Sequence, residues 1–297
     1  MKTVKDVFAD YRQALNKLYD ANESEAITLI AVSEICKLSK AKIKAFPESE
    51  LSHEQAEKLN EILIQLKTGK PIQYILGKTE FYGLPFNVNP SVLIPRPETE
   101  ELVGWVITTV SSLKLAVNSG QLAVGSILDI GTGSGCIAVS LKKNLPAFNI
   151  SGIDISNEAL QTAKENAKLN HVAIDFFEAD ILNFKSEVVN CKSEIIISNP
   201  PYVTLHDKMQ MHPNVIEFEP HTALFVPEDD PLIFYKAIAD FAAAHLVPNG
   251  LLFFEISENY SEEIIKLLAD KNFKNIELRK DMSGRDRMVR ATFNGGD

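Results

Sequence analysis

The chain has 297 residues, of which 45% are hydrophobic and 24% are charged. This balance is typical of a globular protein and excludes a disordered or collagen-like chain, and the length predicts about two domains. The 40 acidic residues outnumber the 30 basic residues, which gives a net charge of -10. Proteins that bind duplex nucleic acid need a basic surface, so the charge disfavours that class, although an acidic total is compatible with a local basic patch.

No targeting or membrane-spanning segment is expected. An acid, Asp6, follows the first residues and no small-residue cleavage site is present, so the start does not resemble a signal peptide. No stretch approaches the roughly 18 apolar residues of a membrane span. The scattered, odd-numbered cysteines, Cys36, Cys136 and Cys191, indicate reduced thiols. We therefore expect a cytoplasmic protein without disulfides and without a membrane partner.

Residues 1–70 are predicted to form an amino-terminal helical bundle. Apolar residues recur on one helical face over 4–18 and again over 27–38. A third helix is expected to begin at Ser52, where the sequence has a capping-box pattern. Residues 71–97 contain short strand-like pieces broken by glycine and proline, which predicts a linker that carries a hairpin.

Residues 98–297 are predicted to form an α/β domain. After a helix that begins near Glu98, short apolar runs alternate with helical stretches, which is typical of a mostly parallel sheet with helices on both faces. We expect strands at 127–130, 149–154, 173–177, 194–198 and 250–256, helices that begin near Gly135, Ser156, Asp230 and Ser261, and a final hairpin that includes 287–293.

A glycine-rich loop, Gly131-Thr132-Gly133-Ser134-Gly135, follows the first of these strands. Its backbone can approach a ligand closely because three positions lack a side chain. The last glycine comes one position too early for the dinucleotide fingerprint, which disfavours a pyrophosphate ligand. The loop instead resembles the first motif of S-adenosylmethionine-dependent methyltransferases. This resemblance implies S-adenosyl-L-methionine as cofactor and S-adenosyl-L-homocysteine as product.

Two acidic residues follow the next two strands. Asp154 ends the second strand, where a carboxylate can accept hydrogen bonds from both hydroxyls of a ribose. The alternative is that Asp154 only favours the start of the helix at Ser156. Asp180 follows the third strand and can accept from an adenine amino group, or it is an ordinary loop acid.

The segment 194–202 is the most informative, because a buried strand leads into Asn199-Pro200-Pro201-Tyr202. The prolines either end the strand or preorganise a ligand-binding loop at the carboxyl edge of the sheet, and the nearby glycine loop favours the second reading. The motif resembles that of methyltransferases acting on a planar nitrogen, either a carboxamide or the amine of adenine. The Asn199 oxygen and the Pro200 carbonyl can each accept one N–H and stabilise the positive charge that develops on the nitrogen. Tyr202 can pack beside the planar group, and neither a metal nor a strong general base is required.

Several longer motifs make the resemblance specific. In chain order they occupy 71–77, 81–86, 92–100, 219–220, 254–256 and 284–287. Together they resemble the release-factor glutamine N5-methyltransferase family (PrmC/HemK) over roughly residues 71–293. The resemblance implies a helical domain that recognises the substrate, a hairpin linker and a Rossmann-like, seven-stranded methyltransferase domain. It also implies methylation of the glutamine in the Gly-Gly-Gln loop of peptide chain release factors.

The resemblance also implies which residues act. Cofactor contacts are expected from Gly131, Thr132, Gly133, Ser134, Gly135, Asp154, Asp180, Ile181 and Asn199. Glutamine contacts are expected from Asn199, Pro200, Pro201 and Tyr202, of which Asn199, Pro200 and Tyr202 are the catalytic candidates. The chain departs from the family pattern at Ile181, where an aromatic residue is common, at Ser257, where glycine is common, and in 225–231, which lacks the usual glycines.

Three alternatives stay open. A glutamine of a ribosomal protein can be the methyl acceptor instead of one in a release factor. A nucleic-acid adenine-N6 methyltransferase is disfavoured by the net charge and by the lack of room for a target-reading domain. The third alternative is a cofactor-binding scaffold without activity. No metal site is expected, because the histidines of the loop after the proline motif fit no metal-ligand spacing; they are His206, His212 and His221.

Overall fold

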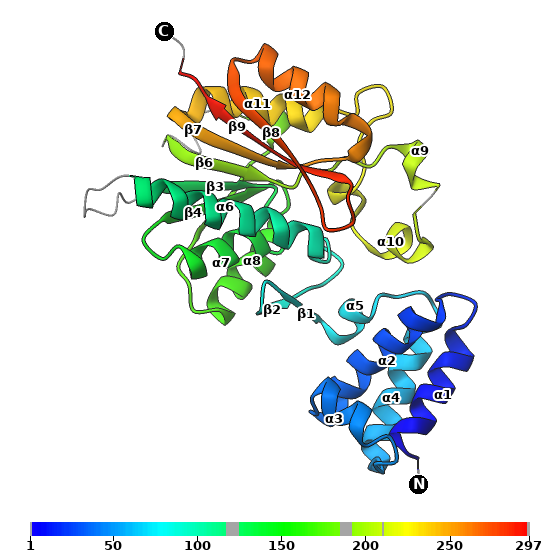
Figure 1. Cartoon of the computed structure of the whole chain (residues 1–297). Coiled ribbons are helices and arrows are strands. Elements are labelled where there is room, and N and C mark those ends of the chain that lie inside the picture. Colours follow the sequence, from blue (N-terminus) through cyan, green and yellow to red (C-terminus); the bar gives the residue numbers. More distant parts are fainter. Residues whose placement is uncertain (1, 117–124, 185–191, 210, 296–297) are drawn as a thin grey trace. The chain divides into compact units, whose positions relative to one another are not determined.

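The computed structural model describes residues 2–116, 125–184, 192–209 and 211–295 (Figure 1). By its contacts the chain divides into two compact units. The first comprises the chain up to Gly77 together with His212–Phe218, and the second comprises Lys78–Met211 and the chain from Glu219 onward. Cys36 and Cys136 carry free thiols, and Cys191 lies outside the described residues.

Among the residues that the structure describes, no helix combines the length and the apolar character needed to cross a bilayer.

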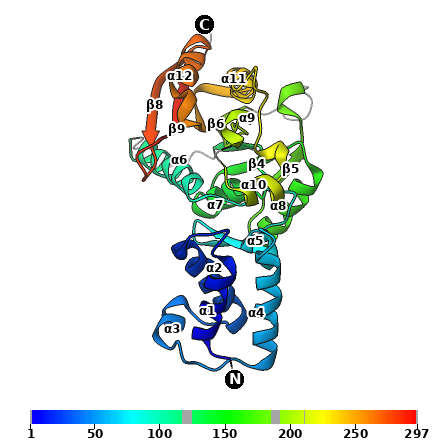
Figure 2. The same ribbon diagram turned by 90° about the vertical axis from the view of Figure 1, so that its right-hand side faces the viewer.

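The first unit is a helical bundle in which α1, α2 and α4 lie side by side (Figures 1 and 2). Its core is closed by fully buried side chains that include Val7, Leu15 and Leu59. The capping box predicted at Ser52 is present, with Gln55 as its partner. The helices of this unit are α1 (Val4–Leu15), α2 (Ala21–Cys36), α3 (Lys40–Ala45), α4 (His53–Leu66), α5 (Ile72–Leu76) and α10 (Pro213–Phe218).

Helix α5 stands where the sequence predicts a strand-like piece at the start of the linker. Ile72 and Tyr74 bury their side chains, and the helix ends at Gly77, which adopts the left-handed conformation that glycine tolerates. Five residues are too few for a 3.6-residue period to be recognised in the sequence.

The segment His212–Phe218 is separated from the rest of the first unit by more than a hundred residues of sequence. The imidazole of His212 stacks on the ring of Tyr19, with centroids 5.6 Å apart, and its Nε2 donates to the carbonyl oxygen of Leu18 at 2.9 Å. These contacts attach the short helix α10, which lies far along the sequence, to the first unit.

The second unit contains a hairpin and a seven-stranded sheet. The hairpin pairs β1 (Lys78–Phe81) with β2 (Leu84–Asn87). The strand order in the sheet is β5-β4-β3-β6-β7-β9-β8, and every pair is parallel except those made by β9. The strands are β3 (Ser126–Ile130), β4 (Asn149–Asp154), β5 (Asp175–Glu178), β6 (Ser193–Ser198), β7 (Leu246–Glu255), β8 (Phe273–Lys280) and β9 (Asp286–Phe293).

Helices cover both faces of this sheet (Figure 1). On one face, α6 (Pro97–Ala116), α7 (Cys136–Asn144) and α8 (Asn157–Leu169) pack over the strands. On the other face lie α11 (Ile233–His245) and α12 (Ser261–Asp270). The remaining short elements are α9 (Leu205–Lys208), η1 (Ile181–Asn183), η2 (His221–Ala223) and η3 (Glu258–Tyr260). The predicted fold class is confirmed.

Strand positions agree with the expectation to within a few residues. The strand at 149–154 is found as predicted, and the final hairpin is formed by β8 and β9. The third strand begins at Asp175 instead of position 173, and β7 begins at Leu246, four residues early. Because β3, β4, β5 and β6 are parallel, the loops that follow them meet at one edge of the sheet.

Candidate active site

A cavity of about 370 Å³ opens at the carboxyl edge of the parallel strands, within the second unit. Its walls come from the loops after β3, β4, β5 and β6, from the chain before α6, and from η2 and α11. Ten of the predicted site residues line it: Gly131, Thr132, Gly133, Ser134, Asp154, Asp180, Ile181, Asn199, Pro200 and Pro201. Gly135 and Tyr202 are not among its lining residues.

The glycine loop presents bare backbone to the cavity. Gly131 and Gly133 have positive φ angles of 72° and 54°, and a Cβ added to either would meet no atom within 4 Å. The amides of Gly131 and Thr132 both donate to the carbonyl oxygen of Ile153, each at 2.9 Å. The loop is therefore held by the neighbouring strand, and its two first glycines leave space on the ligand side.

Gly135, unlike Gly131 and Gly133, faces a neighbouring helix and does not line the cavity. Its φ is 76°, and a Cβ there would come within 3.0 Å of the Ala163 Cβ and 3.2 Å of the Ala163 Cα. The glycine thus allows the start of α7 to approach α8. Sequence spacing alone does not distinguish a glycine that faces a ligand from one that faces a helix.

Asp154 links the glycine loop to the next helix. Its Oδ2 accepts from the Gly133 amide at 2.8 Å, and its Oδ1 accepts from the Ser156 amide at 2.9 Å. Burial raises the pKa of Asp154, and the hydrogen bonds from Ser156 and Gly133 oppose that rise. Asp154 therefore supports the start of α8 and also lines the cavity, so the two alternatives from the sequence are compatible. Each carboxylate oxygen retains a lone pair for a ligand.

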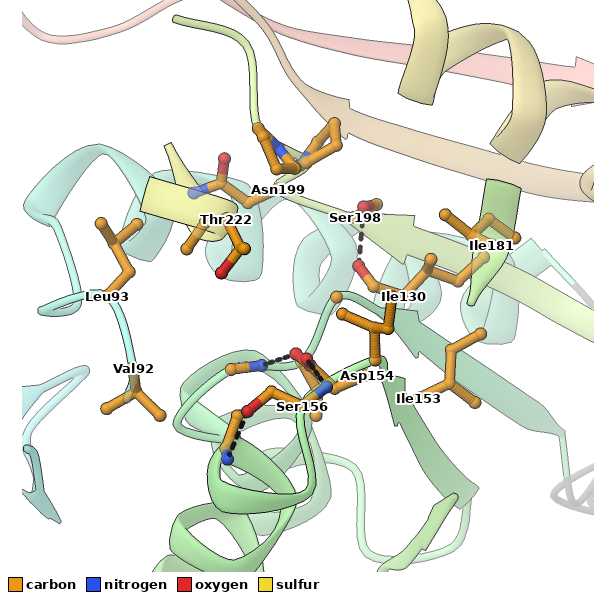
Figure 3. Close-up of a pocket in the computed structure, with 18 of the residues that line it drawn as sticks. Val92, Leu93, Ile130, Ile153, Asp154, Ser156, Ile181, Ser198, Asn199 and Thr222 are labelled. Atoms are coloured by element: carbon orange, nitrogen blue, oxygen red, sulfur yellow. Dashed lines mark hydrogen bonds between the residues drawn. The ribbon is translucent and has the colours of Figure 1, made fainter. Parts of the chain in front are cut away.

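Asp180 caps the short helix η1. Its Oδ1 accepts from the Leu182 amide at 2.9 Å and its Oδ2 accepts from the Asn183 side chain at 2.7 Å. Beside it, Ile181 lies with Ile130 and Ile153 on one side of the cavity (Figure 3). This wall of the cavity is therefore aliphatic.

Asn199 lies on the opposite side of the cavity from Asp154 (Figure 3). Its position is fixed at the end of β6, where the hydroxyl of the preceding Ser198 donates to the Ile130 carbonyl oxygen at 2.7 Å. The side-chain nitrogen of Asn199 donates to the Thr99 hydroxyl at 3.1 Å. The oxygen of this amide makes no hydrogen bond to the described residues.

Tyr202 follows the lining residues Pro200 and Pro201 and bonds to a buried carboxylate. Its hydroxyl donates to Oε1 of Glu255 at 3.3 Å, and the Thr99 hydroxyl donates to Oε2 of the same carboxylate at 2.6 Å. Burial raises the pKa of Tyr202, and the negative charge of Glu255 adds to that rise. Burial also raises the pKa of Glu255, against the hydrogen bond from Thr99 and the charge of Arg287.

The sequence analysis assigned no role to several residues that line the cavity. Val92 and Leu93 come from the chain before α6, and Thr222 comes from η2 (Figure 3). Val92 and Leu93 belong to the family-like motif at 92–100, whereas no sequence motif includes Thr222. The chain before α6 is anchored by the buried Glu219, which pairs with Arg96 at 2.5 Å and accepts from the Ile94 amide.

Within the described ranges, no group of three or more His, Cys, Asp or Glu side chains is arranged to hold a metal ion. Cys136 lines the cavity, and burial raises the pKa of its thiol to about 12, so it is not a reactive thiolate at neutral pH.

Two family models match parts of this chain. Residues 6–77 match the model of the PrmC N-terminal domain, and residues 111–218 match the Methyltransferase small domain. A release factor glutamine methyltransferase of Flavobacterium psychrophilum is 46% identical over 98% of this chain and 99% of its own length. One of Bacteroides thetaiotaomicron is 37% identical over 96% of this chain and 98% of its own.

A solved structure supports the fold alone. The hMettl16 catalytic domain, in complex with MAT2A 3'UTR hairpin 6, is 16% identical, with a TM-score of 0.55 over 73% of this chain and 77% of that one. Both relatives match this chain over nearly the whole length of each protein. The chain belongs to the family of release factor glutamine methyltransferases.

Proposed function

We propose that this protein transfers a methyl group from S-adenosyl-L-methionine to the side-chain nitrogen (N5) of the glutamine in the Gly-Gly-Gln loop of peptide chain release factors. The product is N5-methylglutamine. The observation that carries the proposal is one cavity with Asp154, which is bonded to Gly133 of the glycine loop, on one side and Asn199 on the other. The activity named for the two relatives supports the choice of substrate.

The residues of the cavity fit S-adenosylmethionine. Gly131 and Gly133 leave open space where a side chain would stand, and Asp154 supplies a carboxylate that can accept from ribose hydroxyls. Ile130, Ile153 and Ile181 offer an apolar wall to the adenine ring. When bound, S-adenosylmethionine supplies an electrophilic methyl group on a sulfonium centre.

The residues at the other side of the cavity hold the glutamine. An amide nitrogen is a weak nucleophile because its lone pair is conjugated with the carbonyl group. The oxygen of Asn199 and the carbonyl oxygen of Pro200 each accept one N–H of the substrate amide, orient its lone pair and stabilise the developing positive charge. Pro201 restricts where that carbonyl points. Tyr202 acts by fixing the loop, and the surplus proton leaves to water.

Each of the predicted domains has its own role in this reaction. In the proposal, the bundle at residues 1–70 recognises the release factor, the linker is 71–97 and the methyltransferase domain is 98–297. The match of residues 6–77 to the PrmC N-terminal domain supports a separate role for the bundle. A cytoplasmic location and the absence of direct nucleic-acid binding stay predictions, supported by the net charge of -10.

The test is mass spectrometry of purified release factors after incubation with the protein and labelled cofactor. The wild type is expected to add one methyl group to the glutamine of the exposed loop. Asn199→Ala and Asn199→Asp are expected to abolish transfer and to leave cofactor affinity nearly unchanged. Asn144→Asp, an exposed asparagine at the end of α7, is the control and retains the wild-type rate. Transfer only to a ribosomal protein or to nucleic acid, or full activity in the Asn199 variants, contradicts the proposal.

A further inference from the structure

A buried series of hydrogen bonds leads from Asn199 through Thr99, which also lines the cavity, to Glu255. The side-chain nitrogen of Asn199 donates to the Thr99 hydroxyl at 3.1 Å, and that hydroxyl donates to Oε2 of Glu255 at 2.6 Å. Thr99 is only 3% exposed and Glu255 only 2%. The three residues come from the first turn of α6, the end of β6 and the end of β7.

The hydrogen bonds of this series all run in one direction, and Glu255 sets that direction. A carboxylate has no hydrogen to donate, so the single hydrogen of the Thr99 hydroxyl is used in the bond to Glu255. The hydroxyl oxygen of Thr99 can then only accept from Asn199. The only donor atom of an asparagine side chain is its nitrogen, so the oxygen must occupy the other position.

This orientation matters because the two ends of an asparagine amide have nearly the same shape and opposite hydrogen-bonding character. With the oxygen free, Asn199 can accept an N–H from an incoming amide nitrogen. With the side chain turned over, it would present its own N–H groups to another donor, and the contact would be repulsive.

We propose that Thr99 and Glu255 are positioning residues, which act together as a relay that keeps the Asn199 amide in the orientation that accepts the substrate N–H. The inference rests on the proposed function, since it assigns the substrate amide to Asn199. The geometry is preorganised, because the Asn199 side chain does not have to turn when the substrate arrives.

Burial raises the pKa of Glu255, and the Thr99 hydrogen bond, the charge of Arg287 and the Tyr202 hydrogen bond oppose that rise. The direction of the bonds requires only that Oε2, the oxygen that accepts from Thr99, carries no hydrogen. The other carboxylate oxygen accepts from Tyr202, so the same group also holds the last residue of the proline motif. Arg287 is itself anchored by Asp281 and by the Ile256 carbonyl.

The first experiment compares Thr99→Val, which keeps the shape but removes the hydroxyl, with Thr99→Ser, which keeps the hydroxyl. Thr99→Val is expected to lower kcat about tenfold or more, because the amide of Asn199 loses the acceptor that orients it. The KM for the release factor and the Kd for S-adenosylmethionine are expected to stay within about twofold, since neither depends on one amide hydrogen bond. Thr99→Ser is expected to restore kcat. Thr109→Val, a buried threonine farther along α6, is the matched control.

Glu255 is tested in the same way. Glu255→Gln still offers an oxygen to the Thr99 hydroxyl and is expected to keep most of the kcat, whereas Glu255→Met offers none and is expected to lose as much as Thr99→Val. Thermal unfolding of each variant shows whether the fold is retained. Wild-type kcat in Thr99→Val, or an equal loss in Thr99→Ser and Thr99→Val, overturns the relay.

A second readout is independent of the reaction. In the nitrogen-15 NMR spectrum of the full-length protein, the side-chain amide signal of Asn199, identified by its loss in Asn199→Ala, is expected to show contacts to Thr99. It is expected to persist in Thr99→Ser and to shift in Thr99→Val. If the wild type methylates no release factor, the proposed function fails, and this signal still decides on the relay. An unchanged signal in Thr99→Val overturns the relay.

Discussion

Replacing Gly135 with alanine tests the assignment of this glycine to helix packing. Its φ of 76° lies in the left-handed region, which costs a residue with a Cβ about 1–2 kcal/mol. The new methyl group would also stand 3.0 Å from the Ala163 Cβ and 3.2 Å from its Cα, where the backbone of α8 has to move. Overpacking of this kind costs about 1–3 kcal/mol, so the sum is about 2–5 kcal/mol. For a unit of roughly 200 residues that corresponds to a fall in Tm of roughly 5–15 °C.

The assay is differential scanning calorimetry of the intact protein, combined with titration of S-adenosylmethionine well below the Tm. Gly131→Ala is the matched variant, because Gly131 has a similar φ of 72° but open space where the Cβ would stand. Gly131→Ala is expected to lower the Tm less and to weaken cofactor binding by roughly tenfold or more, since the methyl group enters the cavity. Gly135→Ala is expected to leave the Kd within about twofold.

The reasoning is refuted if the two variants exchange their effects. A Gly135→Ala protein with the wild-type Tm would show that the approach of α7 to α8 does not need a glycine. A Gly135→Ala protein with the wild-type Tm and a weakened Kd would place this residue at the ligand, as the resemblance to the family implied.

Three further predictions follow from single side chains. Asp154→Asn is expected to raise the Kd for S-adenosylmethionine about 10- to 100-fold in calorimetric titration, because charge-assisted acceptors are lost; an unchanged Kd removes Asp154 from the site. Burial raises the pKa of Asp129 to about 7. Because the pKa of Asp129 is higher in the folded state than in the unfolded state, the contribution of Asp129 to stability is full below about pH 4 and is lost as the pH rises to about 7. The Tm difference between the wild type and Asp129→Asn should therefore change between these pH values and be constant above them. Arg96→Gln leaves the buried carboxylate of Glu219 without its cation and is expected to cost about 1–3 kcal/mol, discounted because Arg96 is one-third exposed. Arg285→Gln, whose ion pair is exposed, should leave the Tm nearly unchanged.

Much of the fold is encoded locally and could be read from the residues in order. The capping box at Ser52 and the cap at Ser156 each depend on side chains within three residues of the backbone groups that they satisfy. The strand at 149–154 carries two buried isoleucines, Ile150 and Ile153, within six residues. Helix α5 could not be predicted in this way, because it is stabilised by burial of Ile72 and Tyr74 and is too short to show a helical repeat of apolar residues.

The sequence by itself determined the α/β class, the glycine loop and the proline-locked Asn199, because each is carried by neighbouring residues. Only the tertiary structure decided that Gly135 faces a helix, that Tyr202 bonds to Glu255 and that Thr99 meets the same carboxylate, which is 156 residues away. Such contacts depend on how helices and strands pack, and packing brings together side chains whose separation along the chain bears no relation to their distance in space.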